Sequence, residues 1–232
     1  MVPYDGMHPF IHKWKLFALS LLAGLLVSGF LLLALEELHE EIAKPFFIHM
    51  DLQIQQAVHG HTSVARTRWM KGLTWIGSPQ LLFPGVPLIA ALFWWRRLRR
   101  EAMVFFISMA GGAMLNTALK LHFRRVRPDV PWALVHEHSF SFPSGHSVCA
   151  VVMYGTLVYL GMRYLRLGWE RVAIIVAAVA VVSGIGLSRI YLGVHYPSDV
   201  AAGYLVGCIW LMTVIGADWN LQRMARLRRK VS

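Results

Sequence analysis

Six apolar blocks, separated by short polar stretches, run through the chain. They cover about residues 16–35, 70–95, 102–121, 144–164, 172–187 and 197–217. A helix needs roughly 20 apolar residues to cross a bilayer core, and all the blocks are near that length except 172–187, which is short. We therefore expect six membrane-spanning helices. Pro79, Pro84 and Pro87 are expected to kink the second one, which is tolerated where neighbouring helices satisfy the freed backbone groups.

A longer segment of mixed character, residues 36–68, separates the first two blocks. Apolar side chains recur there among polar ones, namely Phe46, Phe47, Leu52, Ile54 and Val58. Such a pattern favours short helices that lie at the membrane surface. The sequence therefore predicts an all-α fold: a single membrane-embedded domain over residues 1–232, built as a six-helix transmembrane bundle with short interfacial helices between spans one and two.

The composition agrees with a membrane protein and narrows the choice of partners. Hydrophobic residues make up 56% of the chain and the mean hydropathy is +0.51, whereas soluble domains are roughly 45–50% apolar. The net charge of +11 could indicate nucleic-acid binding. Here, however, the basic residues form short clusters between apolar blocks, which is typical of topology signals and of attraction to anionic lipid head groups. We expect membrane lipids, and no nucleic acid, as partners.

The basic clusters also orient the chain. Most of the 23 Lys and Arg residues fall on one side if six spans alternate across the membrane. The positive-inside rule then places both termini in the cytoplasm, with residues 1–15 as the N-terminal segment and 218–232 as a basic tail. The loops after spans one, three and five face outward, and the expected location is the plasma (inner) membrane of a bacterium.

Three outward-facing segments contain polar residues that a lipid-facing helix would avoid. They are residues 120–128, 142–147 and 188–199. Lys120, Arg127 and Arg189 supply fixed positive charge, and the planar arginine fork suits phosphate oxygens. Ser144 and Gly145 stand where a helix begins, so that free backbone N–H groups and the positive helix end offer an anion site. The segments together predict a phosphate-binding cradle.

Two histidines add chemistry to this cradle. Pro197 suits the first turn of span six, which puts Asp199 four residues past His195 and close enough to accept a hydrogen bond from its ring. Such a partner fixes the tautomer and leaves the other ring nitrogen free to attack phosphorus. His146 can protonate the leaving alkoxide and later activate water. The sequence thus contains a candidate nucleophile and a candidate acid.

These segments resemble the three signature motifs of the type 2 phosphatidic acid phosphatase (PAP2) superfamily. The pattern is K-x6-R-P, then P-S-G-H, then S-R-x5-H-x3-D, and the sequence matches every position in this order. The resemblance implies that His195 is the nucleophile, that Asp199 holds it and that His146 is the acid. It implies that the phosphate is held by Lys120, Arg127, Ser144, Gly145 and Arg189. It also implies that no metal or other cofactor is required.

The expected function is therefore hydrolysis of a lipid phosphate or diphosphate, with undecaprenyl diphosphate, phosphatidylglycerol phosphate and phosphatidic acid left open as substrates. One alternative is a vanadium-dependent haloperoxidase, whose site resembles this one with vanadate in place of phosphate. Those relatives are soluble, and six apolar blocks argue against this reading. A non-catalytic lipid-binding or transport protein is the other alternative; the pair of histidines argues against it, since a binder has no need for both.

Two other polar clusters receive a weaker interpretation. His136, Glu137 and His138 resemble a fragment of a metal site, but no further ligands follow at suitable spacing, and we expect no metal there. Arg124 and Arg125, with the nearby His122, could touch substrate. An exposed basic loop is the favoured reading for them.

Overall fold

The structure is a computed structural model that describes residues 33–229, and it is all-helical over that range. The predicted fold class is confirmed. The helices are α2 (Pro45–His59), α3 (Val64–Ile76), α4 (Pro79–Trp95), α5 (Arg99–Phe123), α6 (Gly145–Gly161), α7 (Gly168–Tyr191) and α8 (Pro197–Arg229), and residues 33–42 are also helical. Nearly all of the expected first span, 16–35, lies outside the described residues. The described residues fall into two compact units that divide between His49 and Met50, and the site lies in the second.

The second apolar block is broken rather than kinked. α3 ends at Ile76 and α4 begins at Pro79, and the two helices meet at an angle of 40°. Proline lacks an N–H and disfavours a helical conformation at the preceding residue, so Pro79 suits the first turn of a new helix. Ser78 caps that helix by accepting a hydrogen bond from the Leu81 N–H at 3.4 Å. Pro84 and Pro87 lie inside α4.

The fifth block was expected to be short, and this was wrong. α7 has 24 residues because polar residues extend the helix at both ends of the apolar stretch. The Glu170 carboxylate accepts from the backbone N–H groups of Arg166 and Leu167 at the start. Arg189 continues the last turn because its side chain is buried among polar partners.

By length and composition, three described helices can cross a membrane: α5, α7 and α8. The bent pair α3–α4 makes a fourth if it counts as one span, and α6 is a shorter apolar helix of 17 residues. Several helices of this length and composition in one chain are those of a multi-pass membrane protein. The count of six spans stays a prediction, because the first span falls outside the described residues.

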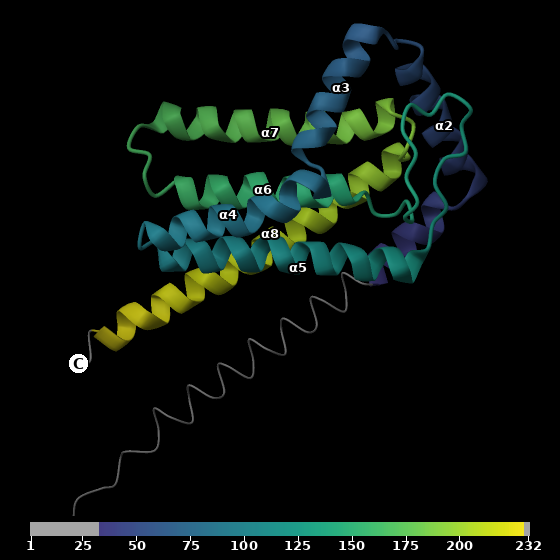
Figure 1. Ribbon diagram of the computed structural model, residues 1–232. Coiled ribbons are helices and arrows are strands. Elements are labelled where there is room, and N and C mark those ends of the chain that lie inside the picture. Colours follow the sequence, from purple (N-terminus) through teal and green to yellow (C-terminus); the bar gives the residue numbers. More distant parts are fainter. Residues whose placement is uncertain (1–32, 230–232) are drawn as a thin grey trace, which may run out of the picture. The chain divides into compact units, whose positions relative to one another are not determined.

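Helix α6 lies at the centre of the second unit and packs against α5, α7 and α8 (Figure 1). Its closest neighbour is α8, where two glycines remove the bulk between the backbones. A Cβ on Gly203 would lie 2.7 Å from the Ser144 carbonyl oxygen, and one on Gly207 would lie 2.8 Å from the Val151 Cβ. This close approach brings the first turn of α8 beside the first turn of α6, where the backbone N–H of Ser144 donates to the Asp199 carbonyl at 3.0 Å.

Candidate active site

Polar residues from three distant parts of the chain meet around a cavity of about 850 Å³. The predicted site residues that line it are Lys120, Arg127, Gly145, His146 and His195. Those that are buried directly behind them are Ser144, Arg189 and Asp199. The end of α5, the start of α6 and the connection from α7 to α8 therefore form one site, as the spacing predicted. The rest of the cavity wall is largely apolar and comes from α4 and α5.

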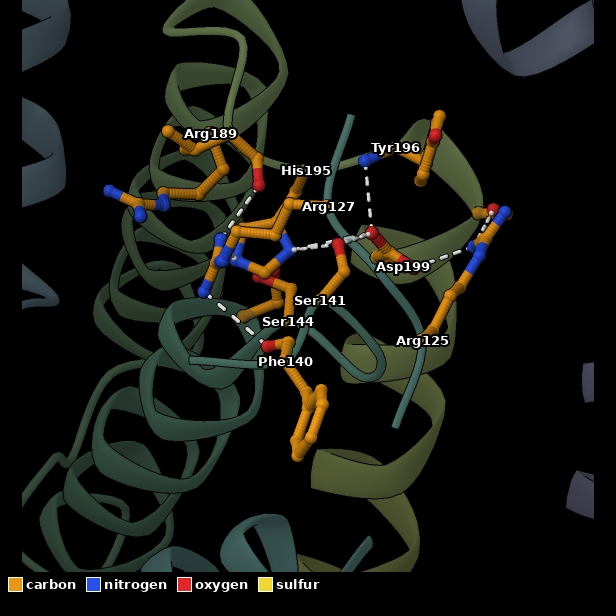
Figure 2. A network of polar contacts seen from close by, with 12 residues as sticks. Arg125, Arg127, Phe140, Ser141, Ser144, Arg189, His195, Tyr196 and Asp199 are labelled. Carbon is orange, nitrogen blue, oxygen red and sulfur yellow. Dashed lines mark hydrogen bonds and ion pairs between the residues drawn. The ribbon is translucent and has the colours of Figure 1, made fainter. Parts of the chain in front are cut away.

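The imidazole of His195 sits between a carboxylate and a guanidinium (Figure 2). Its Nδ1 lies 3.5 Å from Asp199 Oδ2, and its Nε2 lies 3.1 Å from Arg127 Nη1. An arginine can only donate hydrogen bonds, so Nε2 must be the acceptor and the ring proton must be on Nδ1. This assignment turns the lone pair of Nε2 toward Arg127 and the cavity.

The backbone around His195 follows from the local sequence. Gly193 has a φ of +77°, and a Cβ there would also lie 3.1 Å from the Ala133 Cα, so the turn after α7 requires glycine. Pro197 then begins α8, as predicted. Burial lowers the pKa of His195 to about 4, although the hydrogen bond to Asp199 and the charge of that carboxylate raise it. The imidazole is therefore neutral at pH 7, as a nucleophile must be.

Ser141 was not singled out from the sequence, and it joins His195 to Asp199. Its hydroxyl donates to Asp199 Oδ2 and lies 3.4 Å from His195 Nδ1. The same carboxylate accepts from the Tyr196 N–H at 3.0 Å and from Arg125 Nη1 at 2.6 Å. So many donors favour the ionised form of Asp199. A serine two residues before a P-S-G-H motif is a weak signal, which explains why the sequence did not reveal it.

Arg125 is not part of an exposed basic loop; that interpretation was wrong. Its side chain is only 9% exposed, and besides Asp199 it contacts Asp51 Oδ2, 3.2 Å from Nη2, and Ser198 Oγ at 2.8 Å. The guanidinium also lies over the Tyr196 ring, 4.3 Å from its centre. Two buried carboxylates on opposite sides of one guanidinium explain why this arginine turns inward.

Helix α2 supplies the outer support of the site. Asp51 accepts from the Ser198 N–H at 3.0 Å, and Gln55 donates from Nε2 to the His195 carbonyl at 3.2 Å. Both side chains are buried, at 1% and 0% exposure. We call Asp51, Gln55 and Arg125 the α2 brace. The spacing of Asp51 and Gln55, one helical turn apart, placed them on one face, but nothing in the sequence linked that face to His195.

The cations of the site already have partners. Lys120 donates from Nζ to the Phe140 carbonyl, and Arg127 donates to the carbonyls of Ser139, at 2.6 Å, and Val194, at 2.7 Å. Burial lowers the pKa of Arg127, a group that stays charged at any physiological pH. These backbone carbonyls hold the two cations in fixed positions beside the cavity. Cations fixed in this way are suited to stabilising an anionic group that enters it.

Arg189 is bound to Glu137, which sequence reasoning had placed in a weak metal motif. Arg189 Nη2 forms an ion pair with Glu137 Oε1, and its Nη1 donates to Thr74 Oγ1 at 2.7 Å. Glu137 also lies 3.5 Å from Arg127 Nη2. Among the described residues, no group of three or more His, Cys, Asp or Glu side chains is placed to hold a metal ion. We call Lys120, Arg127 and Arg189 the cation cradle, and Glu137 is a carboxylate partner of its two arginines.

The start of α6 completes the site. Ser144 is its N-cap, with an extended backbone, and its hydroxyl accepts from Ser147 Oγ at 3.0 Å. Gly145 and His146 follow in the first turn, where backbone N–H groups have no partner within a helix. A Cβ on Gly145 would lie 3.0 Å from Asn116 Nδ2, so a larger residue there would press on α5. The positive end of α6 thus points its first turn at the cavity.

A helical membrane bundle with a buried His–Asp pair, a second histidine and a cradle of cations is the kind of arrangement that phosphoryl transfer from a lipid requires. The chain belongs to the PAP2 superfamily, whose family model matches residues 101–223. The resemblance inferred from the motifs is confirmed.

Three relatives illustrate the relationship. Phosphatidylglycerophosphatase B of Bacillus subtilis (strain 168) is 35% identical over 156 residues, which cover 66% of this chain and 76% of that protein. The crystal structure of a transmembrane PAP2 type phosphatidylglycerolphosphate phosphatase from Bacillus subtilis superimposes with a TM-score of 0.75 at 31% identity, covering 84% of this chain and 96% of the other. The undecaprenyl-diphosphatase of Sulfolobus acidocaldarius is 30% identical over 127 residues, 53% of this chain and 57% of that protein.

Proposed function

We propose that this protein is a membrane lipid phosphatase that hydrolyses a lipid phosphate or diphosphate through a phosphohistidine formed at His195. The observation that carries the proposal is the orientation of His195: Nδ1–H faces Asp199, and the lone pair of Nε2 faces the cation cradle. The relatives act, by their names, on lipid phosphates, which favours this function over a haloperoxidase or a lipid-binding protein.

The first half of the reaction transfers the phosphoryl group to the enzyme. His195 Nε2 attacks phosphorus, the bond from phosphorus to the lipid oxygen breaks, and His146 gives its proton to that oxygen. The negative charges of the bound phosphate offset the surrounding cations and favour the protonated form of His146 at this step. The imidazole ring becomes positively charged as the new P–N bond forms. Asp199, which faces its Nδ1–H, stabilises this charge.

The second half releases inorganic phosphate. His146, now neutral, accepts a proton from water as the water oxygen attacks phosphorus; the P–N bond breaks and its electron pair returns to Nε2. In both halves Lys120, Arg127 and Arg189 stabilise the charge on the equatorial oxygens. The backbone N–H groups of Ser144 and Gly145 add to this anion site. Each step leaves the protein in the protonation state that the next step needs.

The apolar part of the cavity suits the lipid tail. Phe83 and Val86 of α4, with Phe106 and Met109 of α5, line the wall away from the cations. The head group would reach the cations while the tail stays between helices. Among the three candidate substrates we put phosphatidylglycerol phosphate first. The relative that is 35% identical over 76% of its length and the crystal structure with a TM-score of 0.75 both bear that activity in their names.

We further propose that the protein lies in the plasma membrane with both termini in the cytoplasm and the site at the outer face. Supporting this orientation, the arginine-rich connections 96–100 and 163–171 lie at the end of the bundle opposite the site (Figure 1). Single cysteines are introduced at Asp129 and Arg166 in a cysteine-free background, and a membrane-impermeant thiol reagent is added to intact cells. Asp129→Cys should be labelled and Arg166→Cys should not. Labelling at Arg166→Cys but not at Asp129→Cys would reverse the orientation.

The activity is tested with purified protein in detergent against undecaprenyl diphosphate, phosphatidylglycerol phosphate and phosphatidic acid, with phosphate release as the readout. We expect turnover of at least one lipid, led by phosphatidylglycerol phosphate. His195→Ala should lower it by about 10⁴-fold or more, since loss of a nucleophile removes the covalent route. His61→Ala, an exposed histidine outside the site, is the matched control. Unimpaired hydrolysis by His195→Ala would refute the proposal.

A further inference from the structure

The carboxylate of Glu137 lies between two arginines of the site, Arg127 and Arg189. One oxygen of Glu137 pairs with Arg189 Nη2, and the other lies 3.5 Å from Arg127 Nη2. Glu137 lines the same cavity as His195 and His146. Carboxylate and phosphate oxygens both accept hydrogen bonds from guanidinium N–H groups, so Glu137 and a phosphate in this cavity would compete for the same donors.

The donors of Arg189 leave little room for both anions. Nη1 is bound to Thr74 and Nη2 to Glu137, whereas Nε is buried and, within the described chain, without a hydrogen-bond partner. A phosphate could accept hydrogen bonds from both Nε and Nη2 of Arg189. It would then take the place of Glu137 at Nη2. Two like-charged groups at one fork repel each other, which also favours the departure of Glu137.

Glu137 is placed so that it can move. It belongs to the irregular connection between α5 and α6, and its side chain is 27% exposed, whereas that of Arg189 is 2% exposed. Burial raises the pKa of Glu137, but the charges of Arg189 and Arg127 outweigh this and hold the pKa below its ordinary value. Glu137 is therefore ionised when it leaves Arg189, and its partly exposed side chain can then be hydrated by solvent.

We propose that Glu137 is an internal counter-ion, which the phosphate of the substrate displaces from Arg189 and Arg127 and which returns to expel inorganic phosphate after hydrolysis. This rests on the proposed function, because it assigns the displaced anion to the same phosphate site. It makes Glu137 a determinant of phosphate affinity and of product release. Removing the charge of Glu137 should therefore tighten phosphate binding, whereas removing a residue that only holds the arginines in place should weaken it.

The test is an equilibrium measurement that needs no turnover: the Kd of inorganic phosphate for the full-length protein in detergent, by titration calorimetry. Glu137→Gln keeps the size of the side chain and removes its charge. We expect phosphate to bind about tenfold more tightly, or better, to this variant than to the wild type. Asp129→Asn is the matched control, since it removes an exposed carboxylate from the same connection and should leave the Kd unchanged.

Enzyme kinetics give a second measure of tighter phosphate binding. Glu137→Gln should show a lower inhibition constant for inorganic phosphate and a lower kcat, because product leaves more slowly. Phosphate binding that is unchanged or weaker in Glu137→Gln would overturn the proposal and make Glu137 a strut for the arginines. The proposed function fails separately, through the His195→Ala test, which does not depend on Glu137.

Discussion

Two charge networks lie at opposite ends of α5 and α8, and they differ in how completely their charges are matched. The network far from the site joins Arg100 and Arg163 to Glu101 and Asp218. Tyr159 adds a hydrogen bond to Asp218 at 2.6 Å. Each arginine there faces a carboxylate, and the network ties α5, α6 and α8 together without surplus charge.

The site network lies roughly 30 Å away along α5, at 1.5 Å per residue. Its cations outnumber its carboxylates: they are Lys120, Arg125, Arg127 and Arg189, against Asp51, Glu137 and Asp199. The Nε of Arg189 also lacks a partner within the described chain. The same residue types therefore have two different roles. A closed network holds helices together, whereas an open one with excess positive charge is ready to accept an anion.

Among changes to the charges of the two networks, the largest effect is expected from Asp199→Asn, which keeps the shape of the site network and removes one charge from it. The amide can donate to His195 Nδ1, which favours the wrong tautomer and leaves Nε2 protonated. We expect kcat to fall by roughly 10³–10⁴-fold, the scale seen when a triad aspartate is replaced by asparagine. Phosphate release under saturating lipid measures it, and a fall smaller than tenfold would contradict the role given to Asp199.

A smaller effect is expected from the α2 brace. Asp51→Asn removes the carboxylate that pairs with Arg125 and should let the His195–Asp199 geometry drift, which lowers kcat on the order of 10- to 100-fold while KM changes little. Gln53→Ala, on the exposed face of α2, is the control. If KM rises instead and kcat is kept, Asp51 acts on lipid binding and not on the nucleophile.

Breaking the far network should separate stability from activity. Asp218→Ala leaves Arg100 without its main partner and should lower the free energy of unfolding by about 1.5–3 kcal/mol, the range for a hydrogen bond to a charged group. The melting temperature in detergent should fall, and kcat at a temperature well below the transition should be unchanged. A loss of activity in a folded Asp218→Ala protein would show that the two networks are coupled.

The smallest effect is the response to mild acid. Activity needs a neutral His195, and protonation removes its lone pair; because burial lowers its pKa to about 4, the acid limb of kcat/KM should lie near that pH and not near 6.5. Between pH 7 and pH 5 the fraction of neutral His195 should therefore change by only about a tenth. An acid limb near pH 6.5 would show that His195 is more hydrated than its burial indicates.

The fold class could be predicted from the sequence, and so could the motif residues that the structure brings together around the cavity, since apolar blocks and ordered polar segments are visible without coordinates. The sequence did not reveal the break before Pro79, because a kink and a new helix start leave the same apolar pattern. It also underestimated α7, whose last turn contains Arg189. A buried arginine looks like the end of an apolar block until its partners, Glu137 and Thr74, are known.

The α2 brace could not be predicted for a different reason. Asp51 and Gln55 lie more than a hundred residues from the loop they support, and contacts over such separations depend on how the helices pack. Arg125 shows the same limit: one arginine among several in a row reads as exposed charge. Glu137 was noticed as part of a metal motif, and only its two arginine partners changed that reading.

A phosphohistidine at His195 can be trapped by rapid acid-free quenching of the enzyme during turnover of a ³²P-labelled lipid phosphate, followed by mapping of the labelled residue. We expect acid-labile, alkali-stable label on His195, carried by Nε2, and none in His195→Ala. Label on another residue, or equal label in His195→Ala, would contradict it.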